Sequence, residues 1–149
     1  MTASLSFQVV VDCADPHVLA EWWAQTMGWE VEPTDEAFIR RMISEGYASE
    51  ADTRTYRGQL WWATGAAITQ PDAPEGGACR RILFQKVPEG KSVKNRMHLD
   101  LRATADGAEL DAVRERLLER GASFLHAASE GPHLWYTMTD PEGNEFCIT

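Results

Sequence analysis

One short stretch in the second half of the chain carries a histidine and two charged residues at every second position. Residues 95–103 alternate polar and apolar side chains, as a β-strand with one apolar face does. The polar face carries His98, Asp100 and Arg102. A titratable imidazole beside a carboxylate and a guanidinium is typical of a polar cavity that binds a ligand or moves a proton. A strand whose histidine is merely hydrogen-bonded would give the same pattern.

The last strand expected from the sequence offers further reactive groups. Glu145 and Cys147 alternate within residues 145–149 and therefore share one face. His98 is a candidate general acid or base that Glu145 or Asp100 could orient. Cys147 could be a nucleophile or a small residue of the cavity wall, and the sequence favours the wall. Candidate ligand-binding residues are Gln8, Trp135, Cys147 and Arg96.

Composition excludes several classes of protein. The chain has 149 residues, 44% of them hydrophobic, and a formal net charge of −9, which is typical of one acidic globular domain. The absence of a basic run argues against nucleic acid and anionic membranes as partners. Three cysteines without CxxC spacing, Cys13, Cys79 and Cys147, argue against a disulfide framework. With no leader or membrane-spanning run in the sequence, we expect a cytoplasmic location.

The order of expected elements places these residues. The first half predicts strands over 5–12, 29–32, 60–64 and 81–87, with helices over 16–27 and 35–45. Residues 48–59 are polar and could form a lid or a solvated excursion. The second half predicts a helix over 108–120 and strands over 95–103, 122–126, 133–139 and 145–149. In each half, a glycine follows the helix that comes after the first strand: Gly28 in the first half and Gly121 in the second. Each glycine could form a left-handed C-cap.

A strand, a helix, a glycine and three strands therefore occur twice. Such a repeat predicts an α+β fold of two βαβββ modules, over about 5–90 and 95–149, in a single domain. Each module would be a small curved mixed sheet with a helix on one face, and together they would enclose a ligand cleft. By this symmetry Gln8 is equivalent to His98.

Several of these motifs resemble the vicinal oxygen chelate superfamily, which includes glyoxalase I, bleomycin-resistance proteins and extradiol dioxygenases. The resemblance rests on the doubled module and on four segments, which are Asp15-Pro16, Trp22-Trp23 with Gly28-Trp29, residues 95–101 and the turn 140–144. It covers nearly the whole chain and is closest to the glyoxalase-like branch. The fold hosts lyases, isomerases, dioxygenases and binding proteins, so it leaves the reaction open.

Metal-dependent members of the superfamily place ligands on the first and last strands of each module. Carried onto this chain, the resemblance implies Gln8, His98, Gln85 and Glu145 as the ligand set, with Leu83 as the alternative to Gln85. The usual glutamate position falls on Cys147, and Glu145 lies two residues earlier. Because a hard divalent ion needs carboxylate oxygens, we expect no tightly bound metal and no other cofactor. A soft ion such as zinc could use His98, Cys147 and Glu145 instead.

Two kinds of function follow from the resemblance. The first is an enzyme of lyase or isomerase type that acts on a small organic substrate by proton transfer at His98, or with a divalent metal. The second is a non-catalytic binder that sequesters a small molecule, as bleomycin-resistance proteins do. In either case we expect a small-molecule ligand and a homodimer, since this family commonly closes its clefts by pairing modules.

Overall fold

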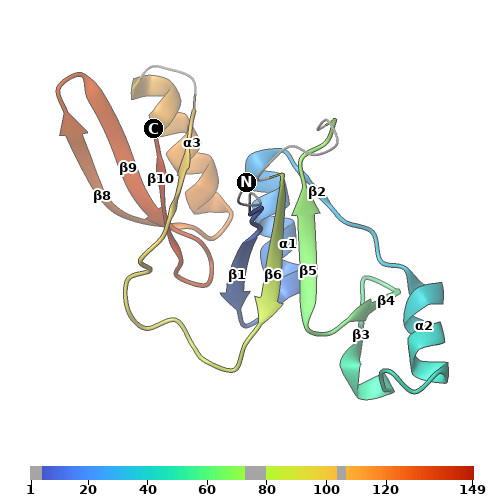
Figure 1. Cartoon of the computed structure of the whole chain (residues 1–149). Coiled ribbons are helices and arrows are strands. Elements are labelled where there is room, and N and C mark those ends of the chain that lie inside the picture. The colour runs from blue at the N-terminus through green and yellow to red at the C-terminus, as the bar shows by residue number, and fades with distance from the viewer. Residues whose placement is uncertain (1–4, 73–79, 104–106) are drawn as a thin grey trace, which may run out of the picture. The chain divides into compact units, whose positions relative to one another are not determined.

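The computed structural model describes residues 5–72, 80–103 and 107–149, and for Gly107 and Ala108 only the backbone. The chain forms two compact units, residues 1–90 and 91–149, each built on its own four-stranded sheet (Figure 1). The fold is therefore of the α+β class, as expected. No helix in the described ranges is long and apolar enough to cross a membrane. Cys79 lies outside the described residues.

Unit 1 is a βαβββ module with an insertion. Its sheet has the order β1-β6-β5-β2, and its strands and helix are β1 (Val9–Cys13), α1 (Pro16–Met27), β2 (Glu30–Val31), β5 (Gly65–Thr69) and β6 (Arg81–Lys86). β1 and β6 are parallel, and the other neighbouring strands are antiparallel. Strand β5 was not predicted, because the sequence Gly-Ala-Ala-Ile-Thr has neither polar alternation nor bulky β-branched residues over most of its length.

Helix α1 has the bounds expected from its sequence because its end signals are local. The side chain of Asp15 accepts a hydrogen bond from the backbone of Val18 at 3.3 Å, and Pro16 occupies the first helical position. Leu19 and Trp23 are buried in unit 1, where α1 packs on β5 and β6. Trp22 and Trp23 are both buried and are therefore core residues.

An insertion of about thirty residues separates β2 from β5. It contains α2 (Glu36–Ser44), the short 3-10 helix η1 (Glu50–Asp52), and a hairpin of β3 (Thr53–Tyr56) and β4 (Gln59–Trp62). Figure 1 shows these elements at the end of the unit 1 sheet where β5 begins. Residues 48–59, expected to be a lid or a solvated excursion, contain η1, β3 and the turn into β4. The strand expected over 60–64 is β4, which instead begins at Gln59 and ends at Trp62.

Polar and aromatic contacts hold this hairpin against α1. His17 is 2% exposed, and its Nε2 lies 3.0 Å from the carbonyl oxygen of Trp62. Its ring stacks on Tyr56 at a centroid distance of 5.2 Å. The Glu21 carboxylate accepts hydrogen bonds from the hydroxyl of Tyr56 at 2.8 Å and from Arg57 at 2.6 and 2.7 Å. These hairpin-to-helix contacts therefore fix the orientation of β3 and β4 within unit 1.

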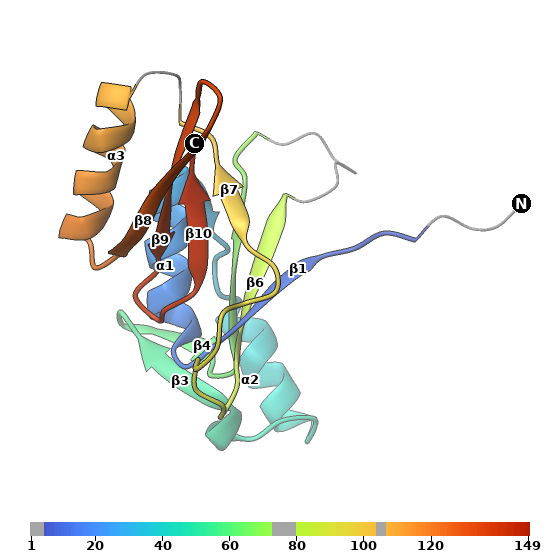
Figure 2. The ribbon, with the colours of Figure 1, turned by 90° about the vertical axis from the view of Figure 1, so that its left-hand side faces the viewer.

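Unit 2 repeats the module without an insertion. Its sheet has the order β7-β10-β9-β8, and its elements are β7 (Leu99–Leu101), α3 (Gly107–Glu119), β8 (Ser123–Glu130), β9 (His133–Thr139) and β10 (Glu145–Ile148). β10 pairs with β7 in parallel and with β9 in antiparallel orientation, as β6 pairs with β1 and β5. In Figure 2, α3 runs alongside β8 and β9, which it contacts. The expected internal repeat is therefore confirmed.

The strands of unit 2 differ in length from those expected. β7 covers only three of the nine residues over 95–103, so His98 directly precedes the strand instead of lying inside it. β8 extends to Glu130, four residues beyond the expected end at His126. The turn at 140–144 forms as expected, because the side chain of Asp140 accepts hydrogen bonds from the backbone of Glu142 and of Asn144.

Valine at either helix-ending glycine should destabilise the protein by about 1–2 kcal/mol, because a β-branched residue resists positive φ. Gly28 and Gly121 have φ values of 66° and 97°, so both adopt the left-handed conformation expected of them. An added Cβ would meet nothing within 4 Å at Gly28 and only Pro141, at 3.7 Å, beside Gly121. The cost is therefore one of backbone conformation. Urea unfolding measures it, with Gly90→Val as control, since Gly90 lies in open space without positive φ. Unchanged midpoints for both variants would contradict the prediction.

Candidate functional site

One face of the unit 2 sheet gathers polar side chains. Phe146 and Ile148 of β10 are buried, and their partners on β9 include Tyr136, whose hydroxyl donates a hydrogen bond to Asp111 of α3. This is the face that α3 covers. The residues between them point to the other face. There Cys147 lies between Asp100 on β7 and Thr137 on β9, its direct partners in the two ladders.

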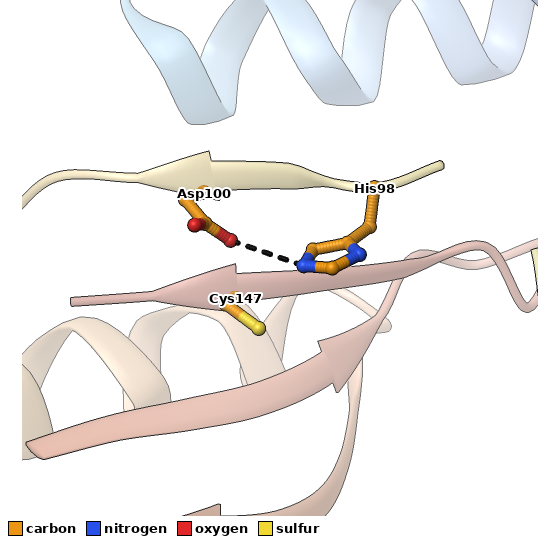
Figure 3. A group of neighbouring side chains, drawn as sticks. All are labelled: His98, Asp100 and Cys147. Carbon is orange, nitrogen blue, oxygen red and sulfur yellow. Dashed lines mark ion pairs between the residues drawn. The ribbon is translucent and has the colours of Figure 1, made fainter. Parts of the chain in front are cut away.

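His98, Asp100 and Cys147 form a compact group on this face (Figure 3). The Nε2 atom of His98 lies 3.3 Å from Oδ1 of Asp100, and one donor atom from each of the three residues lies within 4.8 Å of the others. The imidazole and carboxylate are exposed, with 42% and 59% of their side chains accessible. Cys147 is buried, and its Sγ lies 3.6 Å from Oγ1 of Thr137.

The geometry suits a histidine that accepts or donates a proton. Figure 3 shows Asp100 facing one ring nitrogen of His98, while the other nitrogen points away from the carboxylate. When Asp100 accepts the Nε2 proton, Nδ1 carries the lone pair and is the atom that can take a proton from a ligand. Asp100 would then stabilise the imidazolium that forms. Sequence reasoning and structure therefore both place Asp100 beside His98.

Glu145 has a different set of partners. Its Oε1 accepts a hydrogen bond from Nζ of Lys91 at 2.9 Å, and its Oε2 accepts one from the backbone of Asn95 at 3.0 Å. Burial raises the pKa of Glu145, but the bonds from Asn95 and Lys91 outweigh it and lower this pKa to about 2. Glu145 therefore fixes the segment that leads into His98, and it is not one of the three residues whose donor atoms gather there.

The residues that the resemblance implies for a metal do not fit a hard divalent ion. Both oxygens of Glu145 are already engaged, one of them by an ammonium group. Gln8 accepts a hydrogen bond from Nη1 of Arg81 at 3.0 Å, so the guanidinium already lies at the oxygen that would bind a metal ion. Of the four implied ligands, His98 and Gln85 remain, and neither of them supplies the carboxylate that a hard divalent ion needs. A soft ion could instead be held by His98, Asp100 and Cys147.

The other ligand-binding candidates are more dispersed. Trp135 is half-buried on β9, two residues before Thr137, and so shares the face of Cys147. Arg96 is exposed in the segment before β7. Gln8 and Gln85 belong to unit 1, where Gln8 precedes β1 and Gln85 lies on β6.

A second histidine on this face was not found from the sequence. His126 pairs with Thr137, whereas Phe124, two residues earlier, pairs with Met138 on the opposite face. The ladder shifts register between Phe124 and His126, so Leu125 is an extra residue that turns His126 toward the face of Cys147. Simple alternation would have placed His126 on the α3 side. No sequence signal marks this bulge.

Unit 1 holds a cavity of about 560 Å³. Its floor is the sheet face opposite α1, where Gly65 and Ala67 of β5 are small enough to leave space beside Leu83 of β6. Its walls are residues 32–35, from the start of the insertion, and the tryptophans of β4. The charged residues of the lining are Glu32, Asp35, Arg81 and Lys86, and Arg81 is paired with Glu32.

In each unit a helix lies across one face of a β-sheet, and the strands follow the same order in both units. Two such units define the architecture of the vicinal oxygen chelate superfamily. The model of the glyoxalase-like domain family matches residues 8–149, and the chain belongs to this family. The resemblance inferred from the sequence is thus confirmed. No curated protein sequence shows a significant match.

Solved structures share the fold at low sequence identity. A possible glyoxalase from Bacillus cereus is 14% identical, with a TM-score of 0.58 and 99% coverage of both chains. The fosfomycin resistance protein FosX from Mesorhizobium loti is 11% identical, with a TM-score of 0.59 over 99% of this chain and 91% of that one. A glyoxalase/bleomycin resistance protein/dioxygenase family enzyme from Burkholderia phytofirmans is 16% identical, with a TM-score of 0.56 over 95% and 94%.

Proposed function

We propose that this protein is an enzyme that moves a proton on a small organic substrate, with His98 as the general acid or base. The observation that supports it is the pair of His98 Nε2 and Asp100 Oδ1 at 3.3 Å, exposed above the buried Cys147. Asp100 orients the imidazole, Cys147 forms the floor beneath it, and Trp135 offers an aromatic surface on the same face. The proposal requires no tightly bound metal, because Gln8 and Glu145 are already engaged.

Exchange of carbon-bound hydrogen tests the proposal without knowledge of the natural substrate. The protein is incubated in D₂O with a panel of small carbon acids, such as α-hydroxyketones and 1,3-dicarbonyl compounds, and deuterium incorporation is followed by NMR. We expect catalysed exchange in at least one compound class, because a general base accelerates proton removal. Compounds that bind but never exchange faster than with an inert protein would overturn the proposal.

A second candidate function is binding without chemistry. The observation that favours it is the unit 1 cavity, which is already formed and is walled by tryptophans. Its size is within the range of small-molecule sites, roughly 300–1,000 Å³. In this case the protein would sequester its ligand, and tight binding without exchange would be the result.

The protein is also proposed to form a homodimer in the cytoplasm. β8 is an edge strand of the unit 2 sheet, and Phe124, Leu125 and Leu134 are exposed on β8 and the adjoining β9. An apolar edge of this kind is a surface for pairing with another chain. Analytical ultracentrifugation at micromolar concentration should show a species of twice the chain mass. A monomer alone would contradict the proposal.

A further inference from the structure

The polar face of the unit 2 sheet carries a row of side chains that crosses all four strands. Cys147 of β10 is paired with Asp100 on β7 and with Thr137 on β9. Thr137 is in turn paired with His126 on β8. Directly paired residues point to the same face of a sheet. The row therefore begins at Asp100, which faces His98, and ends at a second histidine that the proton transfer described above does not use.

His126 reaches this face only because of the bulge at Leu125. Regular alternation after Phe124 would place Leu125 on this face and His126 on the face that α3 covers. Bulges interrupt a ladder and occur often beside active sites, where they re-aim a side chain. The side chain of His126 is exposed and makes no hydrogen bond or ion pair with another residue in the described ranges. Its ring nitrogens are therefore available to a ligand.

The residues between the two histidines form a floor. Cys147 and Thr137 have small side chains, and only 8% and 7% of these residues are exposed. The sulfur of Cys147 and the hydroxyl of Thr137 lie 3.6 Å apart. His98 and His126 are both exposed and stand at opposite ends of this floor.

The spacing of the two histidines fits a small carbonyl compound. A donor atom of the His98 ring lies within 4.8 Å of the Cys147 sulfur, and His126 lies two strands farther along the row. The backbones of Cys147 and His126 are therefore about 10 Å apart. A substrate whose α-carbon and carbonyl oxygen each contact one imidazole at about 3 Å spans roughly 8 Å between the two ring nitrogens. One small molecule can therefore contact both histidines at once.

We infer that His126 is a second catalytic residue, which donates a proton to the carbonyl oxygen of the substrate while His98 removes a proton from the adjacent carbon. The electron pair of the broken C–H bond forms a carbon–carbon double bond, and the π pair of the carbonyl forms the new O–H bond with the proton from His126. The product is a neutral enol, and the step consumes no co-reactant. Reversal of both transfers restores the carbonyl compound and, in D₂O, places deuterium on carbon.

This inference rests on the proposed function and narrows its substrate class to small carbonyl compounds with an acidic α-hydrogen. The test compares exchange of hydroxyacetone and of nitroethane in D₂O by the full-length protein, followed by NMR. Proton removal from hydroxyacetone develops charge on a carbonyl oxygen, which an acid at His126 would neutralise. A nitronate shares its charge between two oxygens and stays unprotonated near neutral pH. His126→Gln should therefore lower exchange of hydroxyacetone about tenfold to hundredfold and that of nitroethane less than about twofold, whereas His98→Gln should lower both rates.

His133→Gln is the matched control, because His133 is an exposed histidine of β9 whose partner in the ladder is Glu130. It should leave both rates unchanged. Exchange of nitroethane by His126→Gln also reports that this variant is folded. An equal loss of both rates in His126→Gln, or no loss of hydroxyacetone exchange, would overturn the role of His126 while proton transfer at His98 stands. Absence of catalysed exchange of both compounds by the natural protein would overturn the inference together with the proposed function.

Discussion

Replacing His98 with glutamine should lower the catalysed rate of hydrogen exchange by about 10²- to 10⁴-fold, the usual contribution of a positioned acid or base. Glutamine retains a hydrogen-bonding amide of similar length but cannot accept a proton near neutral pH. His98 is exposed and directly precedes β7, so the fold should tolerate the change. The measurement is the initial rate of deuterium incorporation by NMR at constant enzyme concentration.

Two further variants separate chemistry from structure. Asp100→Asn should lower the same rate by a smaller factor, because the imidazole keeps its place but loses the carboxylate that stabilises its protonated form. His133→Gln is the control, since His133 is an exposed histidine at the start of β9. Full exchange activity in His98→Gln would contradict the role of His98, whatever the effect of the other variants.

Replacing Glu145 with glutamine should lower the free energy of unfolding by about 2 kcal/mol at pH 7. Only 11% of the Glu145 side chain is exposed, and its two oxygens join Lys91 and the backbone of Asn95 to β10. A neutral amide cannot balance the ammonium of Lys91, and its nitrogen cannot accept the Asn95 hydrogen bond. Guanidinium or urea unfolding measures the loss, and Glu130→Gln, at an exposed position, should have little effect.

The same variant should alter the acid dependence of stability. The folded-state pKa of Glu145 is about 2, below the ordinary value of 4.5, so the unfolded chain binds its proton first as pH falls. The contribution of Glu145 is therefore complete above about pH 4.5 and is lost as pH falls towards 2. Glu145→Gln should show a shallower decline over this window. An identical decline in both proteins would show that Glu145 is not held by these contacts.

The parts of the fold that could be predicted are those with local signals. Asp15, Pro16 and Gly28 define both ends of α1 through a cap, a favoured first position and a left-handed residue. The pair of His98 and Asp100 could be predicted because two residues at i and i+2 near a strand share a face. The repeat of the module could be predicted because both copies carry the same order of such signals.

The parts that could not be predicted depend on contacts between distant residues. Nothing near Glu145 in the sequence indicates that Lys91 and Asn95, about fifty residues earlier, would engage both of its oxygens. The position of His126 depends on a bulge in the β8–β9 ladder. The unit 1 cavity depends on β5, whose small residues gave no strand signal but leave space above the sheet.

Metal content is the most direct test of the central claim, which is that His98 acts with Asp100 and without a tightly bound metal. The protein is purified without chelator, and metals are measured by inductively coupled plasma mass spectrometry beside His98→Ala. We predict substoichiometric metal in both proteins, because Gln8 is engaged by Arg81 and Glu145 by Lys91. One equivalent of zinc or another divalent ion in the natural protein, lost in His98→Ala, would contradict the claim and assign His98, Asp100 and Cys147 to a metal centre.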